Sequence, residues 1–390
     1  MSKKSMADVW KEMEKQHGDE GLYVGNGSMT TYSDAISTGS YALDDALGIW
    51  GVPKGHVIQY AGFESSGKTL LSLCTIAEWQ KKDPNNWAMF IDAEFSFDQT
   101  WAESLGVDTS RLMVYRENKG TEIFNRLIGV PNKRNKTGIV TLAKPGVLNM
   151  EVETGGSGLG VIVLDSIASM QPPQEEDSKA GKDNMALMAR FLPMVLRKLT
   201  PLLSETGVTF IAINQVRFQP GVMYGDPTMS PGGTALKHAC SQMINLGMIR
   251  SAESYILDGD KTQIGHKIRA KVQKNKKAPP FRVAEFSIKY TEGIVNKEDE
   301  IRDIGARYGV IQRPNNKTWI LDDIKYNGKD SISEALKDEK LMLSVFERAK
   351  EAKKNMIVPV KIECNDNEDE TSTNEKIDIE TIEDTTTEEL

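Results

Sequence analysis

The sequence has 390 residues, 39% of them hydrophobic and 27% charged, which is enough for a sizeable core and for more than one folding unit. No apolar run has the length of a membrane span, and the start, MSKKSMADVW, lacks the apolar centre of a signal peptide. The three cysteines have no metal-ligand spacing and argue against a disulfide scaffold, so a cytoplasmic location is expected. Taken alone, the net charge of −8 argues against a nucleic-acid partner.

The acidic residues, however, are unevenly placed along the chain. Residues 363–390 hold twelve Asp or Glu and one Lys, a charge of −11, so residues 1–362 carry a charge of +3. A Thr-rich acidic segment with few apolar residues is expected to be disordered. Two interpretations remain open for it: a solubility tail, or an internal competitor for a basic groove.

In chain order, the sequence first predicts a short amphipathic helix over residues 5–17 and then, in ISTGSYALDDALG, a turn, a Ser cap and a helical turn. Apolar strands that end in polar residues then alternate with helical segments. This pattern is typical of a mostly parallel sheet with helices on both faces, where ligands bind at the carboxyl ends of the strands. The expected strands are 56–62, 87–94, 160–166 and 208–215, followed by amphipathic strands in KIRAKVQKN and AEFSIKY.

After residue 292 the expected secondary structure changes to helix, turn and short strand, and the sequence contains several basic residues. We therefore divide the α/β chain into four parts: an N-terminal arm (1–34), a core (35–292), a small α/β C-terminal domain (293–362) and the disordered acidic tail (363–390). Basic residues of the small domain include Arg302, Arg307, Arg313, Lys317, Lys325 and Lys329.

The stretch GFESSGKT, residues 62–69, fits the pattern G-x-x-x-x-G-K-[ST] between an expected strand and an expected helix. Glycines let the backbone wrap a phosphate group, and the amide groups and helix N-terminus favour its negative charge. Lys68 would neutralise phosphate oxygens, and Thr69 would hold Mg²⁺. Chance produces this pattern in about one per cent of chains of this length, so the stretch predicts a phosphate site.

Carboxylates follow two of the neighbouring strands. Asp165 ends GVIVLDS and is expected to support Mg²⁺, although an Asp in such a place also serves as a helix cap. Glu94, in FIDAEFSFD, is the candidate for orienting or deprotonating a water that attacks the γ-phosphate, with Asp92 and Asp98 as competitors. Trp101 would stack on a base or belong to the core.

Seven stretches stand in an order and approximate spacing that resemble the bacterial RecA recombinases: ISTGSYALDDALG, GFESSGKT, FIDAEFSFD, VIVLDS, INQVRFQPGVMYG, GGTALKHACS and KVQKNKKAPPF. The resemblance covers about residues 5–330, and the acidic tail is similar too. It implies a RecA-like, DNA-dependent ATPase core that uses ATP and Mg²⁺. It further implies a homo-oligomeric helical filament on single-stranded DNA that pairs with double-stranded DNA and exchanges strands in recombination and repair. Single-strand-binding and loader proteins would be further partners.

The resemblance also implies roles for individual residues. Catalysis would rest on Glu94, Lys68, the γ-phosphate sensor Gln215, and Lys274 and Lys276, which would reach the ATP of a neighbouring subunit. The metal would be held by Thr69 and Asp165, and Trp101 stands where the family usually has Tyr. The implied nucleotide contacts are Gly62, Glu64, Ser65, Ser66, Gly67, Lys68, Thr69, Asp98, Trp101, Asp165 and Tyr290.

Two loops would bind DNA, residues 171–184 and 216–233, the second of them coupled to ATP through Gln215. Pro220 replaces an apolar wedge residue of the family, and Pro193 replaces a polar phosphate contact. Residues 5–17 would pack on the next subunit, and the C-terminal domain would capture duplex DNA. The implied DNA-binding residues are Met185, Arg190, Arg197, Arg217, Pro220, Tyr224, Gly232, Gly233 and Thr234.

One region departs from the family, because residues 130–158 are much longer than the usual connection. We expect a surface β-hairpin there, whose basic residues either contact DNA or a partner or are simply solvated. Two other classes of protein share parts of these signals: a hexameric helicase or related motor, and an accessory DNA-binding protein without turnover. KNKKAPPF favours the recombinase over the motor, and the complete set of expected catalytic residues argues against the accessory protein.

Overall fold

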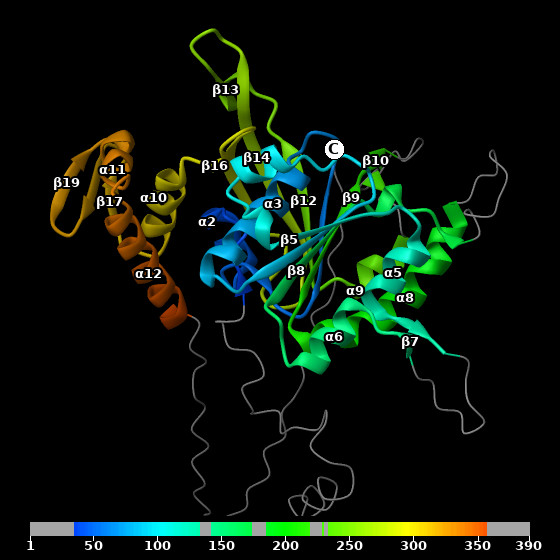
Figure 1. Ribbon diagram of the computed structural model, residues 1–390. Coiled ribbons are helices and arrows are strands. Elements are labelled where there is room, and N and C mark those ends of the chain that lie inside the picture. Colours follow the sequence, from blue (N-terminus) through cyan, green and yellow to red (C-terminus); the bar gives the residue numbers. More distant parts are fainter. Residues whose placement is uncertain (1–34, 133–141, 174–184, 219–227, 230–232, 357–390) are drawn as a thin grey trace, which may run out of the picture.

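The computed structural model describes residues 35–132, 142–173, 185–218, 228–229 and 233–356 (Figure 1). The helix expected at residues 5–17, the acidic tail and most of both expected DNA loops lie outside these ranges. Within them, no helix has both the length and the apolar character needed to cross a membrane.

A large sheet forms the centre of the molecule, in the strand order β16-β15-β14-β12-β3-β9-β8-β4-β5, with β13 paired to β14. The strands from β12 to β5 are parallel, and β14, β15 and β16 extend the sheet antiparallel. The mostly parallel α/β sheet and its four expected apolar strands are therefore confirmed. The strand bounds are β3 Val57–Gly62, β4 Trp87–Asp92, β5 Leu112–Arg116, β8 Leu159–Asp165, β9 Thr209–Gln215, β12 Gln242–Met248, β13 Tyr255–Leu257, β14 Gln263–Asn275, β15 Val283–Lys289 and β16 Gly293–Val295.

Helices cover both faces of this sheet, because its central strands are buried on both sides (Figure 1). One core packs helix α3 against Tyr60 and Phe90 of the sheet, and the other packs α5, α6 and α8 against Phe210. The helices of this part are α2 Tyr41–Leu47, α3 Lys68–Lys82, α4 Gln99–Ser104, α5 Gly120–Ile128, α6 Val147–Thr154, α8 Met185–Thr206 and α9 Gly233–Ala239. Three short 3₁₀ turns accompany them: η1 Thr109–Arg111, η2 Ile167–Ser169 and η3 Ala252–Ser254.

Short strand pairs lie outside the large sheet. They are β1 Ala35–Ile36 with β2 Val52–Pro53, β6 Val130–Pro131 with β7 Leu142–Lys144, and β10 Arg217–Phe218 with β11 Thr228–Met229. The expected Ser cap is present, since the Ser40 hydroxyl accepts a hydrogen bond from the amide of Leu43 at 3.1 Å and begins helix α2.

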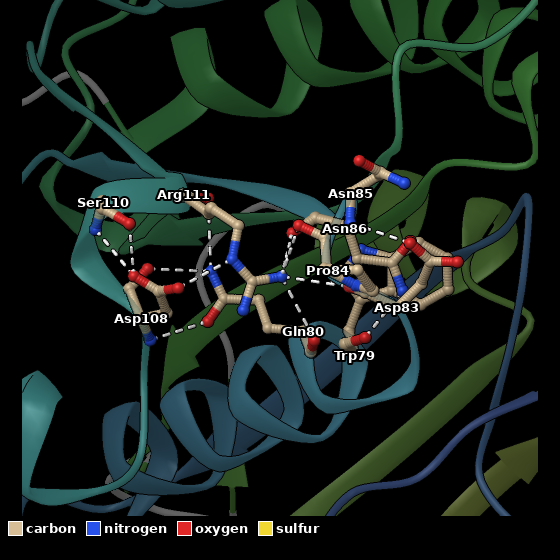
Figure 2. Close-up of polar contacts among 9 residues, drawn as sticks. All are labelled: Trp79, Gln80, Asp83, Pro84, Asn85, Asn86, Asp108, Ser110 and Arg111. Carbon is tan, nitrogen blue, oxygen red and sulfur yellow. Dashed lines mark hydrogen bonds and ion pairs between the residues drawn. The ribbon is translucent and has the colours of Figure 1, made fainter.

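Arg111 joins the C-terminal end of helix α3 to the turn before strand β5 (Figure 2). One guanidinium nitrogen, Nη1, lies 3.0–3.2 Å from the carbonyl oxygens of Gln80, Asp83, Pro84 and Asn86. Its Nε donates to Asp108 at 2.7 Å. These contacts tie Gln80 of α3 and the segment after the helix to the turn before β5. They therefore hold the end of α3 that lies opposite the phosphate loop.

The C-terminal domain has its own core, with Trp319, Leu336 and Phe346 among its buried residues. Its elements are α10 Lys297–Arg307, β17 Gln312–Asn315, β18 Thr318–Leu321, β19 Ile324–Asn327, α11 Lys329–Ala335 and α12 Glu339–Met356. The three strands form a separate antiparallel sheet. Strand β16 still belongs to the large sheet, and the chain leaves that sheet after Val295.

Glu300 of α10 connects the two parts through helix α2. Its Oε2 accepts hydrogen bonds from the Ser40 hydroxyl at 2.8 Å and from the Ala42 amide at 2.7 Å. Burial raises the pKa of this carboxyl from an ordinary 4.5 to about 8, and the two hydrogen bonds only partly oppose that effect. Oε1 is buried and has no hydrogen-bond partner among the described residues.

We expect the free energy of unfolding to fall as the pH rises from 5 to 8, in part because of Glu300. The folded state binds the proton more tightly than the unfolded state, so its stabilising effect is full below pH 4.5 and is lost as the pH approaches 8. Glu300→Gln should weaken this dependence by about 2–4 kcal/mol over that range. Urea unfolding of both proteins at several pH values measures it, and parallel pH profiles would contradict the prediction.

Candidate nucleotide site

The loop between β3 and α3 has the backbone of a phosphate cradle. Gly67 has φ +83°, and a Cβ there would lie 2.5 Å from Ile268, so only glycine fits. A Cβ on Gly62 would lie 2.4 Å from both Leu246 O and Ser66 Oγ. No side chain caps the N-terminus of α3, so the amide groups of its first turn and the helix dipole are available to an anion.

Lys68 begins helix α3 and lies at this loop. Its Nζ donates to Phe63 O at 2.6 Å and lies 3.5 Å from Ser66 Oγ. Burial lowers the pKa of Lys68, while the negative charges of Asp165, Glu94 and Glu64 oppose that shift. A phosphate group in the loop would add a further anion beside the amine of Lys68, a residue that is 9% exposed.

Thr69 and Asp165 meet at the carboxyl ends of β3 and β8. The Thr69 hydroxyl donates to Asp165 Oδ2 at 2.6 Å. Burial raises the pKa of Asp165 to about 6, partly offset by this hydrogen bond. The pair supplies hydroxyl and carboxylate oxygens, the donors that Mg²⁺ prefers. In the described ranges no three His, Cys, Asp or Glu side chains cluster as a metal site, so phosphate and water would complete the shell of an ion held here.

The three carboxylates near β4 that were considered for the role of the base have different contacts in the structure. Asp92 accepts hydrogen bonds from the amides of Ser96 and Phe97 and pairs with Arg116, so it shapes the turn. Asp98 caps helix α4 by accepting from the amide of Trp101 at 2.8 Å. Glu94 is exposed, and its carboxylate contacts the side chains of Ser166, Ser169 and Gln215 rather than backbone amides.

Gln215 ends strand β9 directly beside the phosphate loop. It pairs in register with Gly62, and the amide of Val216 donates to Gly62 O at 3.1 Å. Its Nε2 lies 3.5 Å from Glu94 Oε1, at the outer limit of a hydrogen bond. The expected sensor position is therefore next to the expected base.

A pocket of about 270 Å³ opens beside the phosphate loop. The indole Nε1 of Trp101 donates to Tyr290 O at 2.6 Å, which holds helix α4 against the end of β15. Two aromatic residues that were expected to contact the nucleotide, Trp101 and Tyr290, line this pocket beside the phosphate loop. Asp98 is not among the lining residues and caps α4 instead. The lining residues are Ser65, Gly67, Lys68, Thr69, Leu70, Trp101, His266, Ile288 and Tyr290.

His266 also lines this pocket, and the sequence reasoning missed it. Its Nδ1 lies 3.3 Å from Tyr290 Oη, and burial lowers its pKa, which favours the neutral ring. Nε2 is buried without a partner among the described residues. The alternation His266, Ile268, Ala270, Val272 along β14 places all four on the buried face, and this pattern could have indicated an inward-facing histidine.

Lys274 and Lys276 are not brought to the phosphate loop of their own chain. Lys274 pairs with Met243 at the start of β12. The phosphate loop follows Gly62 of β3, which pairs with Leu246 near the other end of β12. Both lysines donate to carbonyl oxygens at the C-terminus of α9, those of Lys237 and His238, where positive charge is favourable.

The expected DNA-binding residues are only partly described. Arg190 and Arg197 lie exposed on α8, which contains Pro193 and Pro201 within its length. Met185 begins α8, Arg217 begins β10, and Gly233 and Thr234 begin α9. Pro220, Tyr224 and Gly232 lie outside the described residues.

Two of the basic residues named from the sequence for the C-terminal domain serve its packing. Arg302 is buried and bonds Asp299, Asp303 and Ser333, and Arg307 bonds Asp45 of the core. Arg313, Lys317, Lys325 and Lys329 are exposed. A duplex-binding surface on this domain would therefore depend on exposed basic residues such as these four.

The geometry first defines a class of protein. A parallel sheet that leads from β3 through a glycine-rich loop into α3, with Lys68, Thr69 and Asp165 gathered there, is the arrangement of P-loop nucleotide-binding proteins. Within that class, the family model described as the RecA N-terminal domain matches residues 4–132 and 145–295. The chain belongs to the RecA family of bacterial recombinases.

Relatives named Protein RecA are similar along most of the chain. That of Helicobacter pylori (strain P12) is 37% identical over 340 residues, which cover 87% of this chain and 89% of the relative. That of a Nitratiruptor species is 38% identical over 331 residues, covering 84% and 87%. A crystal structure of the RadB recombinase aligns with a TM-score of 0.44 and 22% identity, covering 66% of this chain and 98% of that one.

The family match also narrows the expected insertion at 130–158. Residues 133–144 are unmatched, whereas the match resumes at 145. Strands β6 and β7 pair antiparallel around this segment, but a hairpin across the whole region is wrong. Residues Val147–Thr154 form helix α6, whose Leu148 is fully buried in the core beside α5 and α8.

Proposed function

We propose that the chain is a DNA-dependent ATPase that forms a helical filament on single-stranded DNA. In this filament it would pair the strand with homologous double-stranded DNA and exchange strands, in the cytoplasm. The observation that carries the proposal is the position of Gln215. One strand end places this amide between the phosphate loop and Glu94, and the chain continues through Val216 into the segment expected to bind DNA.

This position supports a two-state coupling between nucleotide and DNA. ATP with Mg²⁺ would be held by the phosphate loop, Lys68, Thr69 and Asp165. A γ-phosphate would compete with Glu94 for the amide of Gln215, and movement of that amide would pull on residues 216–233. DNA bound to this segment would in turn favour one position of Gln215, because such coupling is reciprocal.

The lysines at the far end of the sheet support assembly as part of the mechanism. Lys274 and Lys276 lie away from their own phosphate loop, yet the family resemblance assigns them to the neighbouring subunit's ATP. Cations supplied across an interface would stabilise charge on the γ-phosphate only in the filament. Hydrolysis should then depend on both DNA and assembly.

Phosphate release from ATP, measured with and without single-stranded DNA, tests the proposal. We expect stimulation of tenfold or more, an order of magnitude typical for completing a charged site, together with strand exchange between homologous substrates. Hydrolysis that is indifferent to DNA would argue for an accessory role. Stimulation accompanied by duplex unwinding, but without strand exchange, would instead identify a motor.

A further inference from the structure

Three hydrogen-bond donors converge on a single oxygen of Glu94. The hydroxyl of Ser166 donates to Oε1 at 2.6 Å, and that of Ser169 lies 3.2 Å from the same atom. The amide of Gln215 lies 3.5 Å from it. The two hydroxyls also lie 3.1 Å from each other. None of the three donors occupies Oε2.

The local backbone explains why both hydroxyls reach the same carboxylate. Ser166 follows Asp165 as the N-cap of the 3₁₀ turn η2, and Ser169 is the last residue of that turn. Side chains three residues apart eclipse one another in a 3₁₀ helix, so both hydroxyls lie on one side. Strands β4 and β8 pair Asp92 with Asp165, and this register sets the turn that carries Glu94 beside η2.

Glu94 itself has little else to fix its side chain. It is exposed on the turn after β4, next to Phe95, whose backbone is left-handed with φ +57°. A long exposed carboxylate samples several rotamers unless other groups restrict it. A general base gains rate from being held in the orientation that reaches its water.

We propose that Ser166 and Ser169 are positioning residues that hold Oε1 of Glu94, so that Oε2 accepts the proton of the attacking water. The inference rests on the proposed ATPase function. Gln215 makes the longest of the three contacts, and it is the donor that would leave for the γ-phosphate. The hydroxyl pair remains on Oε1 when Gln215 moves, so the orientation of the base survives the switch.

Ser169→Ala is the variant of choice because Ser169 is only partly buried, whereas Ser166 is fully buried. With saturating single-stranded DNA, its kcat for ATP should fall about tenfold while KM stays within about twofold, since a lost hydrogen bond to a charged group costs about one order of magnitude. Ser169→Thr keeps the hydroxyl and should restore the rate.

The matched control is Ser110→Ala. Ser110 Oγ donates to Asp108 Oδ1 at 2.6 Å (Figure 2), so this substitution also removes a hydroxyl–carboxylate contact. The contact lies before β5, whereas the site lies at the opposite end of that strand. Its kcat should match the wild type. In a Glu94→Gln background, Ser169→Ala should change the residual single-turnover rate by less than about twofold, because positioning acts only through the base.

The results separate this inference from the proposed function. Normal wild-type turnover with an unchanged kcat in Ser169→Ala refutes the positioning role alone. The same holds if Ser169→Thr fails to restore the rate, or if the loss persists in Glu94→Gln. A wild-type chain without DNA-stimulated hydrolysis refutes the proposed function, and this inference with it.

Discussion

Replacing Glu94 with glutamine should lower DNA-stimulated ATP hydrolysis by about a hundredfold or more, the usual contribution of a general base, while ATP and DNA binding survive. Glutamine keeps the size of the side chain and an oxygen that accepts from Ser166, but it cannot take a proton from water. Asp92 and Asp98 cannot substitute, because both are committed to backbone amides. Phosphate release and nucleotide and DNA titrations measure the two properties separately.

Glu103→Gln is a suitable control for this experiment. Glu103 is an exposed carboxylate of α4 that accepts hydrogen bonds from Thr109 and Gln99, so the chemical change is the same but lies away from the phosphate loop. Its turnover should equal that of the wild type. A Glu94→Gln protein that hydrolyses ATP within about threefold of the wild-type rate would rule out Glu94 as the base.

The site was predictable from sequence where local chain features define it. The phosphate loop, Thr69 and Asp165 follow from short patterns at strand ends, and parallel strands carry their carboxyl ends to one edge. The hydroxyls of Ser166 and Ser169 were not predicted, because a turn type decides that they face Glu94. His266 was not predicted either, since its neighbours Tyr290 and the phosphate loop come from other strands.

The fold, too, was predictable where local sequence patterns define an element and was missed where tertiary packing defines it. Strands β3, β4, β8 and β9 are apolar over nearly their whole length because both faces are covered, and such runs are visible in the sequence. Strand β5 was not predicted, since it lies at the sheet edge and most of its residues are exposed. The helix α6 was missed because its glycine-flanked, mixed sequence favours a hairpin and only packing against α5 and α8 makes it a helix.

Removing the carboxylate of Asp45 should destabilise the chain by about 3–5 kcal/mol, the cost of leaving one partner of a buried ion pair alone. Asp45 is 1% exposed on helix α2. Its Oδ1 accepts from Lys353 Nζ at 2.7 Å and from Tyr308 Oη at 2.6 Å, and its Oδ2 accepts from Arg307. Burial alone would raise the pKa of Asp45, but these partners hold it below its ordinary value.

One carboxylate of the core thus binds both α10 and α12 of the C-terminal domain. Lys353 is 4% exposed, and its Nζ also lies 4.2 Å from the centre of the Trp50 ring, so its charge stays largely buried when the carboxylate partner is lost. Asp45→Ala should therefore loosen the contact between the domain and the core, visible in urea unfolding as an earlier transition. Arg348→Ala, which breaks the exposed pair with Asp322 from the helix α12 side, should cost less than about 1 kcal/mol.

A second substitution tests whether the unpaired, buried charge of Lys353 causes the loss of stability in Asp45→Ala. In Asp45→Ala with Lys353→Met, no ammonium group is left uncompensated, and the methionine side chain fills similar volume against Trp50. The double variant should recover a large part of the lost free energy of unfolding, a non-additivity that only contacting residues produce. Equal losses in Asp45→Ala and Arg348→Ala would contradict the prediction, because they would mean that Asp45 contributes no more than one partner of a solvated surface ion pair to holding the C-terminal domain.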